Sequence, residues 1–299
     1  MSAILSVSPD EICLDSGMNE SAFGKTNMSL QLSEDSGTLV EFDEAGSPVH
    51  YKPWHFSKIK TDRENGQVAF YGEGFTGIPL KTLFENGSEK DISPAVILIS
   101  RAISKAVSGN HFIPAVGAGG IIAGKNSILF LPKLIFESSC ASLSDKEKSE
   151  ENGFYLFKGA EKKAALYFLQ SVILYRTLCK NFPFTETDES TRQNDIIDAH
   201  FLPLEYAVNG IDKTLAKAVD EALAPSKKTE TDLQTRVPLG TLQKELGIKT
   251  DGSYEVYSRI PSIPQEDFEK SSKSFFEKQQ NTVSAKRFIY RNKISLICI

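Results

Sequence analysis

Two glycine-rich stretches have the spacing of phosphate-binding loops. Gly72 to Gly77 reads G-E-G-F-T-G and fits the pattern G-x-G-x-x-G. Gly119 to Lys125 reads G-G-I-I-A-G-K and fits a P-loop, but Asn126 then replaces the Ser or Thr that binds magnesium. In such loops backbone N–H groups bind phosphate oxygens, because glycine lets the main chain approach an anion closely. The residue types therefore point first to nucleotide chemistry.

The residues around each glycine motif favour a simple turn instead. A P-loop requires a helix directly after it, but Ser127 to Phe130 (SILF) is strand-like and Pro132 follows. After the first motif, Lys81 comes four residues beyond Gly77. This spacing leaves no room for the strands that would carry a phosphate-binding lysine. We expect turns at both places.

The other reactive side chains are scattered along the chain. The four cysteines form no C-x-x-C pair, which favours neither a zinc site nor a disulfide framework. No H-x-x-x-H spacing occurs among His50, His55, His111 and His200. A G-x-S-x-G hydrolase motif is also missing. We predict no metal site, and the net charge of −5 gives no general attraction to nucleic acid.

The elements that would position these residues follow the order of strands first and helices afterwards. From Met28 to Tyr71, short alternating apolar segments separated by turn residues predict a small antiparallel β-meander. Ser93 to Val107 predicts a helix with Ser93 as its N-cap. Two more helices are predicted over Ala164 to Leu178 and Gly210 to Leu223, with a β-ribbon and a polar loop before them. This order predicts an α+β fold.

The predicted helix AALYFLQSVILYRTL (Ala164 to Leu178) and the following CKNFPF resemble the distal half of a protein kinase C-lobe. Kinases have D-x-x-S-x-G-x-x-L-Y-E-L-L-T-G-x-x-P-F there, and the chain keeps Leu174, Tyr175, Leu178, Pro183 and Phe184. It departs from the pattern at three positions: Leu166 stands in place of the Asp, Arg176 in place of the Glu and Lys180 in place of the Gly. The resemblance implies a protein kinase-like two-lobed fold with a reduced β-rich N-lobe, and IPLKTLF resembles the small helix after a kinase hinge.

The same resemblance implies that the catalytic acids are missing. Leu166 has no acceptor to hold the catalytic loop, as the kinase Asp does, so we expect that loop to lose its kinase geometry. No Asp or Glu lies between His111 and Lys133, and Leu131, Pro132 and Lys133 stand where D-F-G would be. Phosphoryl transfer relies on magnesium held by carboxylates. We therefore predict a degenerate, pseudokinase-like bacterial member of the superfamily, without catalytic residues, that binds a protein partner in regulation or signalling.

Two alternatives stay open. An atypical Ser/Thr-type protein kinase would bind ATP between the lobes through Lys52, Lys125 and Asn126, and tight magnesium-dependent ATP binding would favour it. A non-kinase α+β structural or interaction protein would carry the same helix by coincidence, and a sheet without a hinge to the helical part would favour that one. Unless ATP is retained, no cofactor is expected.

Four regions are expected along the chain. They are a loose tail (1–26), the N-lobe and hinge (27–90), the helical C-lobe (91–250), and a linker with a basic tail (251–299). The N-terminus lacks the apolar run of a signal peptide, which predicts a cytoplasmic protein. From Ser284 onward there is no acidic residue, and ISLICI is too short to cross a bilayer, which takes ~20 residues. This tail is either an ordinary packed terminus or a contact with an anionic membrane surface through Lys286, Arg287, Arg291 and Lys293.

Overall fold

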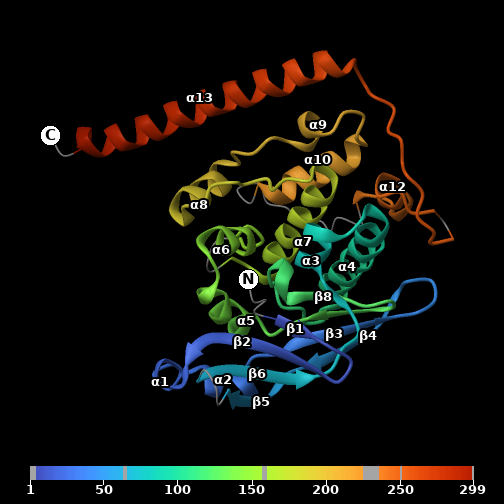
Figure 1. Cartoon of the computed structure of the whole chain (residues 1–299). Coiled ribbons are helices and arrows are strands. Elements are labelled where there is room, and N and C mark those ends of the chain that lie inside the picture. Colours follow the sequence, from blue (N-terminus) through green and yellow to red (C-terminus); the bar gives the residue numbers. More distant parts are fainter. Residues whose placement is uncertain (1–4, 63–65, 157–159, 225–235, 250, 298–299) are drawn as a thin grey trace.

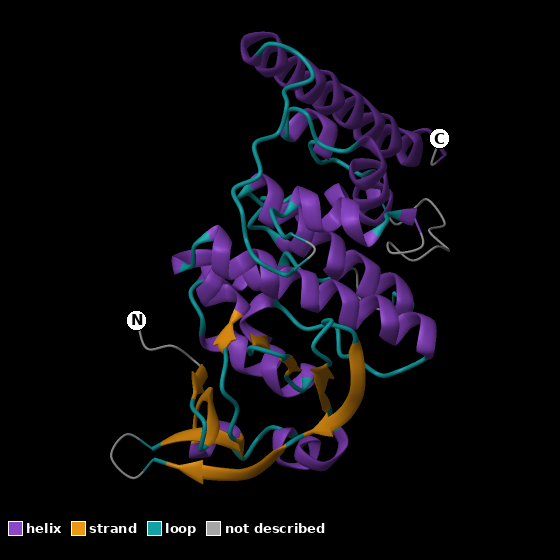
Figure 2. Cartoon of the chain, turned by 90° about the vertical axis from the view of Figure 1, so that its right-hand side faces the viewer, coloured by secondary structure: helices purple, strands orange, loops and turns teal. Residues whose placement is uncertain are grey.

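A computed structural model describes residues 5–62, 66–156, 160–224, 236–249 and 251–297, with side chains as far as Phe288. The strands gather at one end of the molecule and most helices at the other (Figures 1 and 2). All strand pairs are antiparallel. The predicted α+β class is therefore confirmed.

The strands form two sheets. In order across the first sheet they are β1 (Leu5–Val7), β2 (Glu11–Asn19), β6 (Gln67–Glu73) and β5 (Phe56–Thr61). Across the second they are β4 (Pro48–Trp54), β3 (Gly37–Phe42), β9 (Ser127–Phe130), β8 (Ile121–Ala123) and β7 (Ile78–Pro79).

The helices between and after these strands lie in chain order as follows: α1 (Glu20–Phe23), α2 (Met28–Glu34), α3 (Leu80–Asn86), α4 (Glu89–Gly109), the 3₁₀ turn η1 (Ala118–Gly120), α5 (Lys133–Ser139), η2 (Cys140–Ser142), α6 (Asp145–Asn152), α7 (Lys162–Cys179), α8 (Glu189–Asp198), α9 (Leu204–Ala207), α10 (Lys213–Leu223), α12 (Leu239–Glu245) and α13 (Gln265–Ile297).

The predicted β-meander is correct in its hairpins and wrong as a single sheet. β3 pairs with β4 and β5 pairs with β6, but SLQL belongs to helix α2. The chain changes sheets at His55, where Trp54 and Phe56 on either side are both buried and meet edge to face at 4.9 Å between ring centroids. His55 itself stays exposed at this corner.

The expectation of a loose tail over residues 1–26 is wrong for the described residues 5–26. Strand β2 lies between β1 and β6, and Ile12, Leu14 and Ser16 are buried while the residues between them face outward. This is the period-two pattern of a half-buried strand. The polar composition of the segment concealed it.

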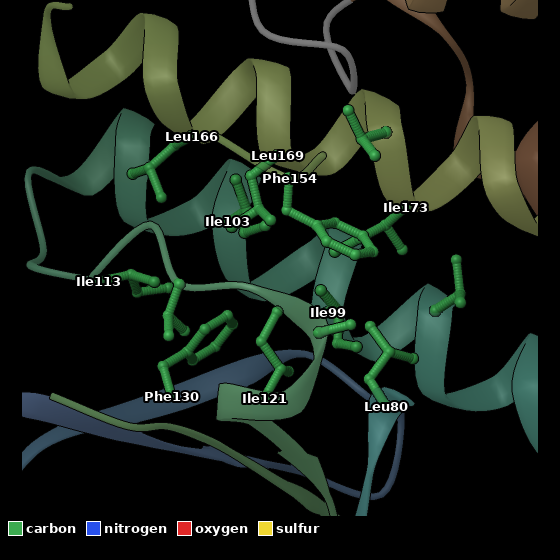
Figure 3. Packing of buried hydrophobic residues seen from close by; sticks show 14 of the residues in the cluster. Leu80, Ile99, Ile103, Ile113, Ile121, Phe130, Phe154, Leu166, Leu169 and Ile173 are labelled. Atoms are coloured by element: carbon green, nitrogen blue, oxygen red, sulfur yellow. The ribbon is translucent and has the colours of Figure 1, made fainter. Parts of the chain in front are cut away.

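The second sheet joins the two expected lobes. β3, from the N-terminal part, pairs with β9 through Thr38–Phe130, Leu39–Leu129 and Val40–Ile128. Buried residues from both sides of residue 90 also form one hydrophobic cluster, in which Leu80, Ile121 and Phe130 lie under the helices (Figure 3). Strands and helices therefore share one core.

Two long helices, α4 and α7, lie at the centre of that core. Ile99 and Ile103 of α4 face Leu169 and Ile173 of α7 across the cluster in Figure 3. Helix α4 begins earlier than predicted, because Ser88 and Asp91 form a capping box and Pro94 lies inside the helix, so Ser93 is not the N-cap. Among the described residues α4 alone is long and apolar enough to cross a membrane, but 67% of that window is buried in the protein.

The residues shared with the kinase pattern have structural roles. The hydroxyl of Tyr175 donates to the carbonyl oxygen of Leu202 at 2.7 Å. The ring of Phe184 stacks on Phe168 and meets Phe201 edge to face. These contacts join α7 to the segment before α9.

The position of β2 predicts the effect of a single truncation. Leu14→Ala should lower the free energy of unfolding by about 3 kcal/mol, because a fully buried side chain (0% exposed) leaves a cavity. Leu30→Ala, at a 66% exposed position, should change it by less than about 0.5 kcal/mol. Urea denaturation measures both. Equal, small effects would mean that β2 is not part of the core.

Candidate functional site

The glycine-rich segment from Gly117 to Gly120 is bound by the chain's own side chains. The carboxylate of Glu151, on α6, lies with both oxygens 3.1 Å from the backbone nitrogen of Gly119. The backbone N–H of Gly117 donates to the hydroxyl of Tyr155 at 2.8 Å. The backbone donors of Gly117 and Gly119 in this P-loop-like stretch therefore already have acceptors.

Close packing explains why glycines stand here. A Cβ on Gly117 would lie 2.2 Å from a carboxylate oxygen of Glu151, and one on Gly119 would lie 2.8 Å from the other oxygen. A Cβ on Gly120 would lie 2.4 Å from a methyl group of Val116. The expected turn is present as η1, and its glycines make room for a carboxylate.

The electrostatics of Glu151 follow from its depth. Its residue surface is only 2% exposed, and burial raises the pKa of its carboxyl group to about 7, against the hydrogen bond from Gly119 and the positive charge of Lys81. The Nζ of Lys81, on α3, lies 4.0 Å from Glu151 and 3.9 Å from Glu147. Burial also raises the pKa of Tyr155 well above its ordinary value.

The loop is held from another part of the chain. Glu151 and Tyr155 provide acceptors for the backbone N–H groups of Gly119 and Gly117. The expectation that this loop loses its kinase geometry because Leu166 replaces an Asp stays a prediction.

Arg192, on α8, is only 2% exposed. Its guanidinium donates to the backbone oxygen of Tyr155 at 3.4 Å and pairs with Glu189. The loop is thus connected through Tyr155 to helix α8.

The first glycine motif also serves packing. A Cβ on Gly72 would lie 2.4 Å from the ring of Trp54, and one on Gly74 would lie 2.1 Å from the backbone oxygen of Pro9. At Gly77 it would lie 2.7 Å from the backbone oxygen of Ala123. The small helix expected after this turn is present as α3.

The proposed nucleotide ligands lie on the surface of the second sheet. Lys52 is an exposed residue of β4, and its Nζ lies 2.6 Å from the carboxylate of Glu41. Lys125 and Asn126 are exposed in the turn between β8 and β9, where the backbone oxygen of Asn126 accepts from the N–H of Phe42 at 3.0 Å. In the part of the chain that the structure describes, no group of three or more His, Cys, Asp or Glu side chains is placed to hold a metal ion.

The basic tail is only partly described. Lys286 and Arg287 lie on α13 and form ion pairs with Asp198 and Asp195 of α8. These two cations are therefore engaged by the protein itself. The side chains of Arg291 and Lys293 lie outside the described residues.

Sequence reasoning missed Glu151 because the polar composition of residues 142–153 predicts a loop, and Tyr155 lies just after that segment. Ser144 and Glu147 have the S-x-x-E spacing of a capping box, and the structure shows both of its hydrogen bonds at the start of α6. That signal predicts a helix, and Glu151 stands one turn beyond Glu147 on the same face.

No protein family model matches the chain, and no curated protein shows significant sequence similarity to it.

The raised pKa of Glu151 predicts a pH-dependent stability. Its carboxyl group has a pKa of about 7 in the folded protein and an ordinary value of 4.5. Between these values the folded chain binds a proton that the unfolded chain does not hold. The contribution of this group to the free energy of unfolding therefore falls by about 3 kcal/mol as the pH rises through that interval.

Glu151→Gln keeps an acceptor for the N–H of Gly119 and removes the titration. Relative to the wild type, its free energy of unfolding should rise by about 3 kcal/mol between pH 4.5 and pH 8. Urea denaturation at the two pH values measures this difference. Glu150, which pairs with Lys146 at 4.0 Å, provides the matched control. The free energy of unfolding of Glu150→Gln should differ from that of the wild type by the same amount at both pH values. If Glu151→Gln also differed from the wild type by the same amount at both pH values, the raised pKa of Glu151 would be contradicted.

Proposed function

We propose that this protein is a non-catalytic, protein kinase-like module that binds a protein partner. The proposal is supported by the order of elements after β7: the short helix α3, the long buried helix α4, a turn with the ribbon β8–β9, the central helix α7 with its Pro183-Phe184 corner, and α10. This is the order that the resemblance to a kinase C-lobe implies.

The observation that carries the proposal is the position of Glu151. Its carboxylate accepts from Gly119 at the place where a phosphotransferase needs a catalytic loop. Glu151 takes up the N–H of Gly119 and the space beside it, and above its pKa of about 7 its negative charge also repels phosphate oxygens. Lys81 lies near Glu151 and Glu147, and Lys52 pairs with Glu41. These lysines already have carboxylate partners.

One observation favours a second candidate, an α+β interaction protein unrelated to kinases. β3 pairs directly with β9, so a single sheet runs from the N-terminal part into the helical part. A two-lobed kinase would instead have a cleft between separate lobes at this level. Both candidates bind a partner and neither transfers phosphate, so they share the same nucleotide test.

ATP with magnesium should leave the melting temperature unchanged within about 1 °C. A ligand present at 100 times its Kd would stabilise the protein by about 2.7 kcal/mol, which shifts the melting temperature by several degrees. The measurement is a thermal melt at millimolar ATP with magnesium, with magnesium alone as reference. Lys52→Ala should give the same result. A saturable shift of several degrees that Lys52→Ala abolishes would support an atypical kinase and contradict this proposal.

A further inference from the structure

Helix α13 lies across the helical end of the protein, beside α8 and α9 (Figure 1). It has 33 residues, and its described contacts with the protein lie between Gln265 and Arg287. Phe268 and Val283 are buried there, but neither belongs to the cluster of described residues that forms the main core. The core therefore closes without α13, and the helix is attached to its surface.

The first half of this contact is aromatic. The ring of Phe275 stacks on Tyr206 of α9 at 4.1 Å between centroids, and Phe276 stacks on His200 at 5.8 Å. The hydroxyl of Ser272 donates to the backbone oxygen of Tyr206. These stacks fix the position of α13 on the surface formed by α8, α9 and their connection.

The second half of the contact is charged. Asp198 accepts from Lys286 at 2.7 Å and from Arg287 at 2.9 Å, and Asp195 accepts from Arg287 at 2.8 Å. The side chains of Asp195 and Asp198 are only 8% and 12% exposed. Burial raises the pKa of Asp198, but the hydrogen bonds from Lys286 and Arg287 outweigh it, and the net pKa is lowered. These ion pairs are thus partly withdrawn from water, where they are screened less than exposed pairs.

The C-terminal end of α8 has internal contacts and one contact with α13. Nδ1 of His200 lies 3.0 Å from a carboxylate oxygen of Asp195, and the backbone N–H of His200 donates to the backbone oxygen of Asp195. Ala199 ends α8 in the left-handed region, at φ 52°, as helix C-caps commonly do. Its carbonyl oxygen accepts from Gln279 of α13 at 3.0 Å.

We propose that the surface formed by α8 and α9, which α13 covers within the chain, is a docking site for a basic, aromatic amphipathic helix of a partner protein. The inference names the partner class for the proposed binding function and rests on it. The partner helix would repeat the spacing of α13: aromatic residues at the position of Phe275 and Phe276, an amide at that of Gln279, and a basic pair at that of Lys286 and Arg287.

The covalent connection decides which helix covers this surface. A segment linked to its own site has an effective concentration in the millimolar range, so a free helix of similar intrinsic affinity competes poorly at micromolar concentration. Weakening the contacts of α13 should expose the surface to an added helix. Substitutions on the outer face of α13 should not.

The test uses the full-length chain and, as probe, a fluorescent peptide with the sequence of residues 265–290. We expect the double variant K286E/R287E to bind this peptide at least ~10-fold more tightly than the wild type does, because its own α13 is repelled by Asp195 and Asp198 while the peptide keeps both cations. The milder variant Arg287→Gln should give an intermediate gain. Fluorescence anisotropy measures the Kd.

Two controls locate the effect. K273E/K278E makes the same change of charge at exposed positions of α13 and should bind the peptide as weakly as the wild type. Adding Asp198→Lys to K286E/R287E should abolish the gain, because the surface then repels the basic pair of the peptide and attracts the two Glu residues of the variant's own α13.

Equal peptide affinity for the wild type, Arg287→Gln and K286E/R287E would overturn the proposed docking site, and so would a gain that Asp198→Lys leaves intact. The thermal melt with ATP tests a different claim. If the peptide fails to bind, the proposed partner class is wrong. If ATP shifts the melting temperature, the proposed non-catalytic function is wrong.

Discussion

A buried carboxylate determines the geometry of the glycine loop. Glu151 lies in the interior and accepts from Gly119, and a side chain on Gly117 or Gly119 would collide with it. Without this acceptor, the buried N–H of Gly119 would be left unsatisfied, which costs about 1–3 kcal/mol. The loop therefore requires both the glycines and the acid. The same pairing occupies the N–H group of Gly119, which in a phosphate-binding loop would face the anion.

Polar contacts continue from this loop to the surface. Tyr155 accepts from Gly117 and is in turn bound by Arg192 of α8, whose Asp195 and Asp198 hold α13. Helix α8 thus contacts the loop anchor on one side and the C-terminal helix on the other. The surface that holds α13 therefore lies on a helix that the buried Arg192 connects to the loop anchor.

The sequence predicts elements with strong local patterns and misses those that depend on distant partners. Helices α7 and α10 follow from apolar spacing, and the α+β class follows from element order. Strand β2 was missed although Ile12, Leu14 and Ser16 alternate, because its composition is polar. The glycine motifs pointed to phosphate binding because a sequence does not show which acceptors bind the backbone N–H groups of such a loop. The pair between Arg287 and Asp195 joins residues 92 positions apart, and no local pattern predicts it.

The most direct measurement is the amide resonance of Gly119 in an NMR pH titration of the ¹⁵N-labelled protein. If Glu151 accepts from this N–H, the resonance should shift with a midpoint near pH 7, the pKa of the buried carboxyl group, and should be insensitive to pH in Glu151→Gln. Added ATP with magnesium should leave it in place. A Gly119 resonance that ignores pH in the wild type and moves on adding ATP would contradict the account.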